Sequence, residues 1–350
     1  MKKKKITIIT LITFIIVTFV LAFFYFRSDG TDSKKQHTSN SFIMDTFVQM
    51  RVYGEDAEDI IDESFARLRE VENKMSVNIE DSYVYQINKN AGIAPVTVDE
   101  EIFMVIKKAI EFAELSNGKF DPSIGPLIKL WGFGTSNASV PDERELNDVL
   151  NKVDYRMIEL DEKEKSVFLL EEGMSLDLGG IAKGYAADLV KDIVKKHNIK
   201  SAYIDIGGNI YVIGNKVDNT PWNIGIQDPR RNRGNVMASI QLSDKTIVTS
   251  GNYERYFIED GETYHHILDT ETGYPADSGI ISASIISENS MEADALSTIV
   301  FMAKPEESIE LIESIDGIEA LVIKENLGII ISSGIKDKIK LKDSDFIILD

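Results

Sequence analysis

The 350-residue sequence contains no cysteine. The chain can therefore build no disulfide framework, and it has no N-terminal cysteine that could carry a lipid. It also lacks the patterns GxxxxGK[ST] and GxGxxG, which excludes a P-loop and the dinucleotide-binding fingerprint of Rossmann folds. Any nucleotide chemistry in this protein must use a different phosphate-binding arrangement.

Basic residues are in the minority. Lysine and arginine number 38 against 58 acidic residues, and the formal net charge is −20. The first 30 residues carry five positive charges and one negative charge, which leaves −24 on the remainder. Such an acidic body excludes nucleic acid as an expected partner, because phosphate backbones bind to basic patches. It would also repel an anionic nucleotide unless a cation or local donors compensate.

The N-terminus contains one long uncharged run. Residues 6–26 carry no charge, and 21 residues at about 1.5 Å rise match the ~30 Å hydrocarbon core of a bilayer. Four lysines precede the run and Arg27 follows it, which predicts a cytoplasmic N-terminus. A cleaved secretory signal is the alternative, but the run is long and residues 23–26 are aromatic rather than small. We expect a single-pass protein of the cell membrane with its folded body outside the cytoplasm.

This pattern divides the chain into three parts: an N-terminal anchor over residues 1–27, a polar flexible linker over 28–40, and a folded domain over 41–350. Helices are predicted over 56–75, 99–117, 142–152, 182–196, 290–303 and 305–315, and strands over 42–53, 166–170, 202–206, 209–214, 222–227, 236–242, 246–250, 254–258, 280–286, 318–324, 328–332 and 346–349. Short turns join most strands between 200 and 260. The mixture predicts an α+β fold with mixed or antiparallel sheets and packed helices.

Asp294 and Thr298 form the most informative pair. On a helix they lie at positions i and i+4, so their oxygens project from one face one turn apart. A carboxylate and a hydroxyl in this arrangement suit a hard cation such as Mg²⁺, which binds oxygen ligands and often shares them with a phosphate. The alternative is that both residues merely cap the first helical turn.

Several stretches are rich in glycine and small polar residues. Gly179-Gly180 precedes a predicted helix, where backbone groups can approach a ligand and the N-terminus favours anions. Lys183 in the first turn opposes the helix dipole, which is unfavourable unless its amine meets an anion such as a phosphate. Gly207-Gly208 lies between two predicted strands and is typical of a tight hairpin. Residues 118–134 contain two prolines and several glycines, which predicts a rigid irregular loop.

Two of the four histidines, His265 and His266, are adjacent. Neighbouring residues on a strand face opposite sides, so the pair does not easily chelate one metal ion. One of the two is the candidate acid or base, and we expect the other to lie on the surface.

Together these stretches resemble the ApbE-like flavin transferases, the FAD:protein FMN transferases. The resemblance extends from about Ser41 to Ala303 and follows the order Met44-Asp45-Thr46, Phe120-Asp121-Pro122-Ser123, Trp131-Gly132-Phe133-Gly134, Asp177-Leu178-Gly179-Gly180-Ile181-Ala182-Lys183-Gly184, Gly207-Gly208-Asn209-Ile210, Thr249-Ser250-Gly251, His266-Ile267-Leu268-Asp269, Thr272-Gly273-Tyr274-Pro275 and Ala293-Asp294-Ala295. Each motif is modest alone, whereas all of them in this order are highly specific. Two positions depart from the family pattern: Asp45 replaces a usual glycine and Thr270 replaces a usual proline.

The resemblance implies the reaction of FAD with a threonine or serine hydroxyl of an acceptor protein, giving an FMN phosphoester and AMP. It implies Mg²⁺ ligation by the side chains of Asp294 and Thr298 and by the Gly180 carbonyl, with glycine at 180 because a side chain would crowd the ion. It implies His266 as the general base acting with Asp294, although His266 could instead only hydrogen-bond FAD. Residues placed near FAD are Met44, Asp121, Ser123, Gly180, Lys183, Asn209, Ser250, Glu254, His266 and Ile267, while Asp188 and Glu254 would support the metal or cofactor.

Two other readings remain open at this point. A Mg²⁺-dependent FAD pyrophosphatase would use the same phosphoryl activation with water in place of the acceptor hydroxyl. A membrane-tethered FAD-binding protein without catalysis would need the flavin contacts but neither His266 nor Asp294. The acceptor of a transferase anchored in this way is expected on the same outer face of the membrane, for example a flavin-dependent redox protein.

Overall fold

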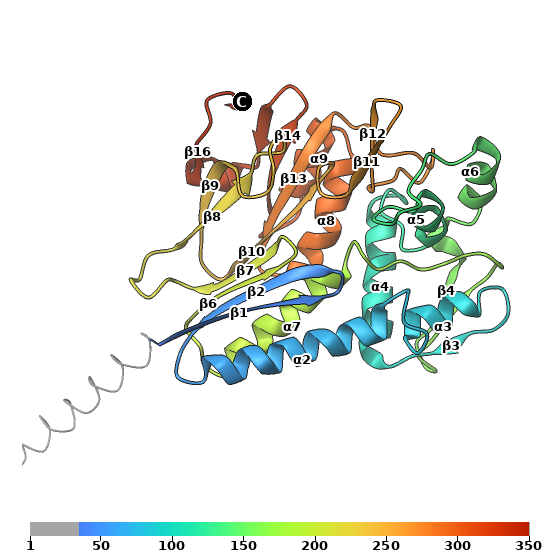
Figure 1. Ribbon diagram of the computed structural model, residues 1–350, viewed down its shortest axis with the longest axis horizontal. Coiled ribbons are helices and arrows are strands. Elements are labelled where there is room, and N and C mark those ends of the chain that lie inside the picture. Colours follow the sequence, from blue (N-terminus) through green and yellow to red (C-terminus); the bar gives the residue numbers. More distant parts are fainter. Residues whose placement is uncertain (1–34, 350) are drawn as a thin grey trace, which may run out of the picture.

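The computed structural model describes residues 35–349. Its centre is a nine-stranded sheet in the order β1-β2-β6-β7-β10-β13-β14-β15-β17 (Figure 1). Its strands are β1 (Gln36–Ile43), β2 (Thr46–Tyr53), β6 (Ser201–Ile206), β7 (Asn209–Gly214), β10 (Lys245–Gly251), β13 (Ile280–Ser287), β14 (Glu319–Lys324), β15 (Gly328–Ile331) and β17 (Ile347–Ile348). Neighbouring strands are antiparallel except β15 and β17, which are parallel. The expected α+β architecture with mixed sheets is confirmed.

Helices cover one face of this sheet. They are α2 (Ala57–Met75), α7 (Ala182–Lys196), α8 (Ser290–Met302) and α9 (Pro305–Glu313). α7 packs against β6 and β7, and α8 packs against β10 and β13. The main hydrophobic core lies between these layers and contains fully buried side chains such as Leu68, Val190 and Leu296. The helical periodicity of the sequence predicted these helices because their apolar residues recur on the face that meets the sheet.

A three-stranded sheet covers part of the other face. It has the order β16-β9-β8 and consists of β8 (Trp222–Gln227), β9 (Val236–Leu242) and β16 (Ile339–Leu341), with the 3₁₀ helix η3 (Ser333–Lys338) preceding β16. A second apolar cluster fills the space between the two sheets and includes Val212, Ile240 and Leu321. The central strands β13 and β14 therefore bury both faces and read as nearly continuous apolar runs, whereas β8 alternates because one of its faces is exposed.

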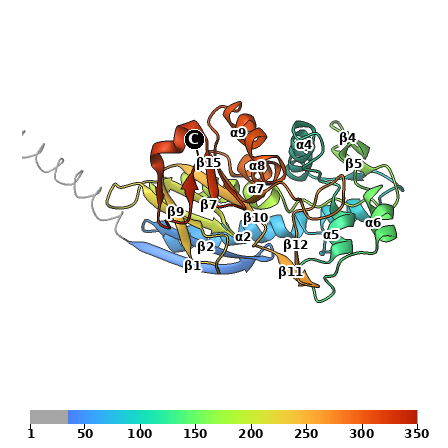
Figure 2. The same ribbon diagram turned by 90° about the horizontal axis from the view of Figure 1, so that it is seen from above.

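The remaining elements lie together to one side of the large sheet, on the right of Figure 1 and Figure 2. They are α3 (Tyr83–Lys89), α4 (Glu100–Leu115), α5 (Gly125–Trp131), α6 (Glu143–Leu150), the 3₁₀ helix η2 (Tyr155–Met157), the small sheet of β3 (Val96–Thr97), β4 (Ile158–Asp161) and β5 (Ser166–Leu169), and the hairpin of β11 (Tyr256–Glu259) and β12 (Glu262–His265). The short helices α3 and α5 were not predicted.

The prediction of one strand over 42–53 is wrong in one respect. This segment contains the end of β1, a hairpin turn and β2. Ile43 pairs with Thr46, and Met44 and Asp45 between them both have positive φ, at 57° and 53°. Two consecutive positive-φ residues form the turn that matches the twist of paired strands. Neither residue is glycine, so the sequence carried no clear signal for the turn.

The linker boundary also shifts. β1 begins at Gln36 and pairs along its whole length with β2, so residues 36–40 belong to the sheet rather than to a flexible linker. The polar alternation of this edge strand resembled a linker because one of its faces is exposed. The predicted membrane anchor lies outside the described residues, and none of the helices within 35–349 is long and apolar enough to cross a membrane.

Candidate active site

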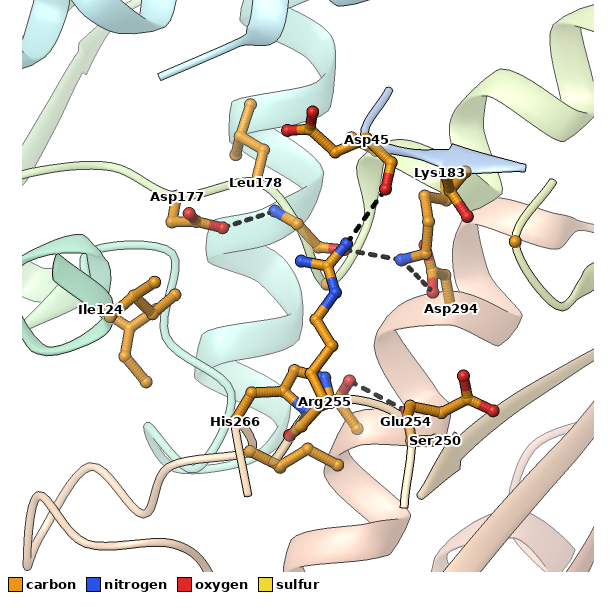
Figure 3. A pocket seen from close by; sticks show the side chains of 18 of the residues that line it. Asp45, Ile124, Asp177, Leu178, Lys183, Ser250, Glu254, Arg255, His266 and Asp294 are labelled. Carbon is orange, nitrogen blue, oxygen red and sulfur yellow. Dashed lines mark hydrogen bonds and ion pairs between the residues drawn. The ribbon is translucent and has the colours of Figure 1, made fainter. Parts of the chain in front are cut away.

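A cavity of about 450 Å³ lies where the N-terminus of α7 and neighbouring loops meet the start of β2, the start of β7 and the end of β10. This size is within the range of small-molecule sites. Every site residue predicted from the sequence lines it except Ser123 and Asp188, namely Met44, Asp121, Gly180, Lys183, Asn209, Ser250, Glu254, His266, Ile267, Asp294 and Thr298. Figure 3 shows several of them around the opening. The fold thus brings together positions that are up to 254 residues apart in the chain.

Asp294 lies at the junction of α7 and α8 and is 4% exposed. Its Oδ2 accepts a hydrogen bond from the Gly184 N–H at 2.8 Å, so a side chain of α8 caps the first turn of α7. The reverse contact also occurs, because Asp188 Oδ2 accepts from the Met291 N–H at the start of α8 at 2.9 Å. These reciprocal caps satisfy helix N–H groups that have no partner within their own helix. They also hold the Asp294 carboxylate in one position.

Asp188 is therefore a structural residue at this junction. Its Oδ1 accepts from the Lys191 ammonium at 2.7 Å while its Oδ2 caps α8, and it does not line the cavity. Asp188 can affect the cavity only through the packing of α7 on α8, and its support of a metal or cofactor stays a prediction.

Thr298 lies one turn after Asp294 on α8, and both side chains line the cavity, as the spacing predicted. The Ser250 hydroxyl lies 3.4 Å from Thr298 Oγ1 and 2.8 Å from Ser297 Oγ. Asp294 Oδ1, Thr298 Oγ1 and the backbone of Gly180 form an all-oxygen donor set, which suits Mg²⁺. Within residues 35–349, no group of three or more His, Asp or Glu side chains is arranged to hold a metal ion.

The Phe120 ring also limits the space at position 180. A Cβ at Gly180 would lie 2.9 Å from Cε2 of Phe120, closer than carbon atoms normally approach. Glycine lets this ring pack against the backbone there, and the expectation that a side chain would crowd an ion stays a prediction. The close approach of that ring holds the 179–180 segment against the loop that contains Asp121.

Lys183 projects from the first turn of α7 toward the same carboxylate. Its ammonium donates to the Gly179 carbonyl oxygen at 2.9 Å and lies 3.6 Å from Asp294 Oδ1. The amine is thus held beside the Asp294 carboxylate by local contacts, despite the unfavourable helix dipole. A phosphate in the cavity could replace this weak ion pair as its partner.

His266 follows β12 and its ring lies against Arg255. Both its backbone N–H and its Nδ1–H donate to the Arg255 carbonyl oxygen, at 3.0 and 3.2 Å. This assignment places the ring proton on Nδ1 and leaves Nε2 as an acceptor. Burial, together with the nearby Arg255 cation, lowers the pKa of His266 from 6.5 to about 4. The imidazole is therefore neutral at physiological pH and able to take a proton.

The expectation that the neighbouring histidine lies on the surface is wrong. His265 is 7% exposed, its Nε2–H donates to the Ala276 carbonyl at 3.2 Å, and its ring contacts Phe301 edge-on at 5.5 Å. Burial lowers its pKa as well. His265 is buried because the Phe301 ring from α8 covers it, whereas His266 at the next position is half-buried.

Two hairpin turns meet at one edge of the cavity. Met44 and Asp45 form the β1–β2 turn, and Gly207 and Gly208 form the predicted β6–β7 turn with φ of 61° and 99°. A Cβ at Gly207 would lie 2.1 Å from Thr46 Oγ1, so the two turns touch. Methionine with positive φ is strained, and the Met44 N–H is held by Glu72 Oε1 at 2.9 Å. The strain fixes the Met44 side chain at the cavity edge.

Asn209 begins β7 and is 2% exposed. Its Nδ2 has no hydrogen-bond partner among the described residues although the side chain lines the cavity. A buried amide donor without a partner is costly, so this group is available to a ligand oxygen.

Asp121 and Ser123 form a small network rather than two ligand contacts. Asp121 Oδ1 accepts from the Ser123 N–H and hydroxyl at 2.7 and 2.6 Å, and Oδ2 accepts from the Tyr155 N–H at 2.8 Å. Burial raises the pKa of Asp121. Ser123 is fully buried and does not line the cavity, because its hydroxyl supports Asp121 from behind.

The aromatic motif of residues 131–134 supports one wall of the cavity. Trp131 is fully buried, donates from Nε1 to the Gly273 carbonyl at 2.8 Å, and contacts the rings of Phe133, Phe257, Tyr264 and Tyr274 at 5.5 to 6.1 Å. Phe120 and Phe133 are the aromatic side chains that line the cavity within the described part of the chain. The tyrosines therefore belong to the scaffold.

Sequence reasoning missed the cationic groups on this cavity. Lys119, Arg233 and Arg255 line it together with Lys183. Arg233 lies 3.9 Å from Glu254 Oε2, and Arg255 Nη2 donates to the Asp45 carbonyl oxygen at 3.5 Å. Ile267 is nearly buried beside them and donates its N–H to His265 Nδ1 at 3.3 Å. The acidic composition of the whole chain hid these cations, which lie among six lining carboxylates and supply local donors for an anionic nucleotide.

Comparisons with known proteins agree with this geometry. The model of the ApbE family matches residues 44–322. The chain is 35% identical over 336 residues to a protein named FAD:protein FMN transferase from Treponema pallidum, covering 91% of this chain and 93% of that protein. A second protein with this name, from Klebsiella pneumoniae, is 34% identical over 314 residues, covering 90% and 97%.

Solved structures show the same relationship. The ApbE protein of Thermotoga maritima superposes with a TM-score of 0.81 at 35% identity, covering 87% of this chain and 99% of that one. The flavin transferase ApbE of Vibrio cholerae superposes with a TM-score of 0.76 at 27% identity, covering 89% and 98%. The family match spans most of the chain, and the cavity contains the residues that the family motifs contribute. This chain therefore belongs to the ApbE family.

Proposed function

We propose that this protein transfers the FMN moiety of FAD to a serine or threonine hydroxyl of an acceptor protein. The hydroxyl oxygen forms a bond to the FMN-side phosphorus, the bond from that phosphorus to the bridging oxygen breaks, and AMP leaves with the bridging oxygen. The hydroxyl proton passes to a base. The relatives named FAD:protein FMN transferase, at up to 35% identity over nearly the full chain, support this assignment.

The observation that carries the proposal is the presence in one cavity of an oxygen donor pair and a neutral imidazole. Asp294 and Thr298 come from α8, whereas His266 comes from the segment after β12. A protein that only held FAD would need neither a buried carboxylate beside a hydroxyl one turn away nor a base with a free Nε2.

A divalent cation fits the donor set, and we propose Mg²⁺ held by Asp294 Oδ1, Thr298 Oγ1 and the Gly180 carbonyl. When bound, the ion would neutralise charge on the phosphates. Asp294 can supply one oxygen without losing its fold contact, because its other oxygen accepts from the Gly184 N–H. Asn209 and Lys183 would donate to phosphate or ribityl oxygens from opposite edges of the cavity.

His266 is the group that we propose takes the proton from the attacking hydroxyl. Its Nδ1–H is occupied by the Arg255 carbonyl, so Nε2 is the atom that receives the proton. Its lowered pKa keeps the ring neutral at physiological pH, so Nε2 is free to take the proton.

We further propose that the chain is anchored in the cell membrane by residues 6–26, with this domain outside the cytoplasm. The uncharged run and the preceding lysines support that arrangement. The acceptor would then be an extracytoplasmic protein, of which a flavin-dependent redox protein is the expected kind.

The test uses the full chain in detergent, incubated with FAD, Mg²⁺ and one candidate extracytoplasmic acceptor at a time. Intact-mass spectrometry of the acceptor should show the mass of FMN less one water, with AMP in equal amount. Free FMN and AMP without an adduct would instead identify a pyrophosphatase. Unchanged FAD with every acceptor, together with measurable FAD binding, would identify a binding protein.

A further inference from the structure

Among residues 35–349, Arg255 is one of four arginines, with Arg51, Arg69 and Arg144, that form no ion pair, and of these four it is the one that lines the cavity. Arg67, Arg156 and Arg230 each pair with a carboxylate, at 2.9, 2.8 and 2.8 Å to the oxygens of Glu70, Asp154 and Asp345. The Arg255 guanidinium has only one contact among residues 35–349, a hydrogen bond of 3.5 Å to the Asp45 carbonyl oxygen. That distance is at the limit of a hydrogen bond, and the guanidinium has five N–H donors.

The Arg255 side chain lines the cavity and is exposed to solvent at its opening. In Figure 3 it extends across the opening, from the side of His266 and Ser250 toward Asp45 and Lys183. It therefore joins the loop before β11 to the β1–β2 turn over the space that the phosphates must occupy. A cation at this opening that has no carboxylate partner among the described residues is available to an anion that enters.

The backbone of the same residue is fixed by its contacts with His266. The Arg255 carbonyl accepts both the N–H and the Nδ1–H of His266. Two hydrogen bonds therefore join the Arg255 backbone to His266. Because Arg255 is set in this way, its side chain can place an anion at a constant position relative to Nε2 of His266. A guanidinium can hold a phosphate through two parallel hydrogen bonds, which also fixes orientation.

We propose that Arg255 is the residue that binds and orients the pyrophosphate of the dinucleotide, exchanging its weak contact with the Asp45 carbonyl for the phosphate oxygens when FAD enters. This inference rests on the proposed function, because it assumes FAD as the ligand. Arg255 then has two roles in one residue: its carbonyl sets the proton position on His266, and its side chain sets the phosphate against that base.

The test compares two ligands that differ in the pyrophosphate. Full-length wild type, Arg255→Met, Arg255→Gln and Arg255→Lys are titrated with FAD and with riboflavin, which lacks phosphate, by flavin fluorescence in the presence of Mg²⁺. Arg144→Met on α6 is the matched control, because it removes the same charge from an exposed helix outside the cavity. Thermal unfolding of each variant reports whether it folds, and the single long contact of Arg255 predicts no loss of stability.

We expect Arg255→Met and Arg255→Gln to weaken FAD binding about 10- to 100-fold, the usual loss when hydrogen bonds to a charged group disappear. Riboflavin binding should not change. Arg255→Lys should recover part of the FAD affinity, because it retains the charge without the planar fork. Equal weakening for both ligands, or none for FAD, would overturn the inference while leaving the proposed function intact. A wild type that binds no FAD would instead overturn the proposed function, and this inference with it.

Discussion

Asp294 and Thr298 lie on one buried helix, whereas His266 and Arg255 lie on a partly exposed segment next to a two-stranded hairpin. On the helix side, α8 is packed against β10, β13 and α7, and its carboxylate is held by the N-terminus of α7. On the hairpin side, β11 pairs only with β12 among the described strands, and Arg255 reaches the opposite turn through one long hydrogen bond. Local geometry sets the first side, while the second depends on contacts between distant segments.

The contrast has a functional reason. A cation site requires oxygens at fixed separations, which a buried helix supplies with little freedom to move. An acceptor protein and a dinucleotide must both enter, so the other side has to remain open to solvent. We expect changes on the helix side to affect chemistry and folding together, and changes on the hairpin side to affect chemistry or binding alone.

The largest effect is expected for Asp294→Asn on the helix side. The amide retains an oxygen that can accept from the Gly184 N–H, but it loses the negative charge for the cation. Transfer should fall at least ~10³-fold, since a bound cation supplies several kcal/mol of charge stabilisation. Acceptor mass spectrometry under a Mg²⁺ titration measures it. Asp188→Asn is the control, because it alters the reciprocal cap but not the cavity. Full activity of Asp294→Asn would refute the metal site.

The next effect concerns the hairpin side. His266→Ala should slow transfer by at least ~10²-fold, the usual contribution of a general base, with FAD affinity retained. Rates and flavin titration separate the two quantities. His197→Ala serves as control, because that exposed histidine pairs with Glu63 at 2.9 Å away from the cavity. Loss of FAD binding in His266→Ala would make this residue a ligand contact rather than a base.

Gly184→Ala tests the junction between α7 and α8. The added Cβ would lie 2.2 Å from the Ser290 carbonyl oxygen and 2.7 Å from Asp294 Cβ. We expect a loss of about 1–3 kcal/mol in the free energy of unfolding, the usual cost of overpacking, and reduced transfer because Asp294 is displaced. Denaturant unfolding measures the first effect. Lys196→Ala, exposed in the last turn of α7, is the control. Unchanged stability would show that the helices can move apart freely.

The smallest effect is a displacement of the pH profile. His266 must be neutral to accept a proton, and protonation as the pH falls inactivates it. Because burial and Arg255 lower its pKa to about 4, the acidic limb of kcat/KM should lie near pH 4 rather than 6.5, and activity should be constant just above it. Arg255→Met should move this limb to higher pH. A wild-type limb near 6.5 would show that the ring is more hydrated than its surroundings indicate.

Regular elements were predictable from the sequence where apolar spacing is regular. The helix over 182–196 agrees with α7 at both ends, and the helix over 290–303 agrees with α8 within one residue. The β1–β2 turn could not be predicted, because Met44 and Asp45 adopt positive φ only when flanking strands and Glu72 hold them there. His265 was misplaced for a similar reason, since the Phe301 ring that covers it comes from α8.

The site shows the same division. Asp294 and Thr298 could be paired from their spacing alone, and the ordered motifs indicated which loops belong together. The role of Ser123 behind Asp121, the Phe120 ring beneath Gly180 and the cations Arg233 and Arg255 could not be read in this way. Each depends on which residues face one another across segments that are far apart in the chain.

The sequence by itself determined the family, the α+β class and the oxygen pair on α8, because these depend on residue types and on spacing within single segments. Tertiary structure alone decided that Asp294 caps α7, that His266 carries its proton on Nδ1, and that the Arg255 guanidinium reaches across the cavity to the Asp45 carbonyl. The physical reason is that hydrogen bonds and charge interactions act over a few ångströms. They are therefore set by the folded arrangement of segments that the order of residues leaves apart.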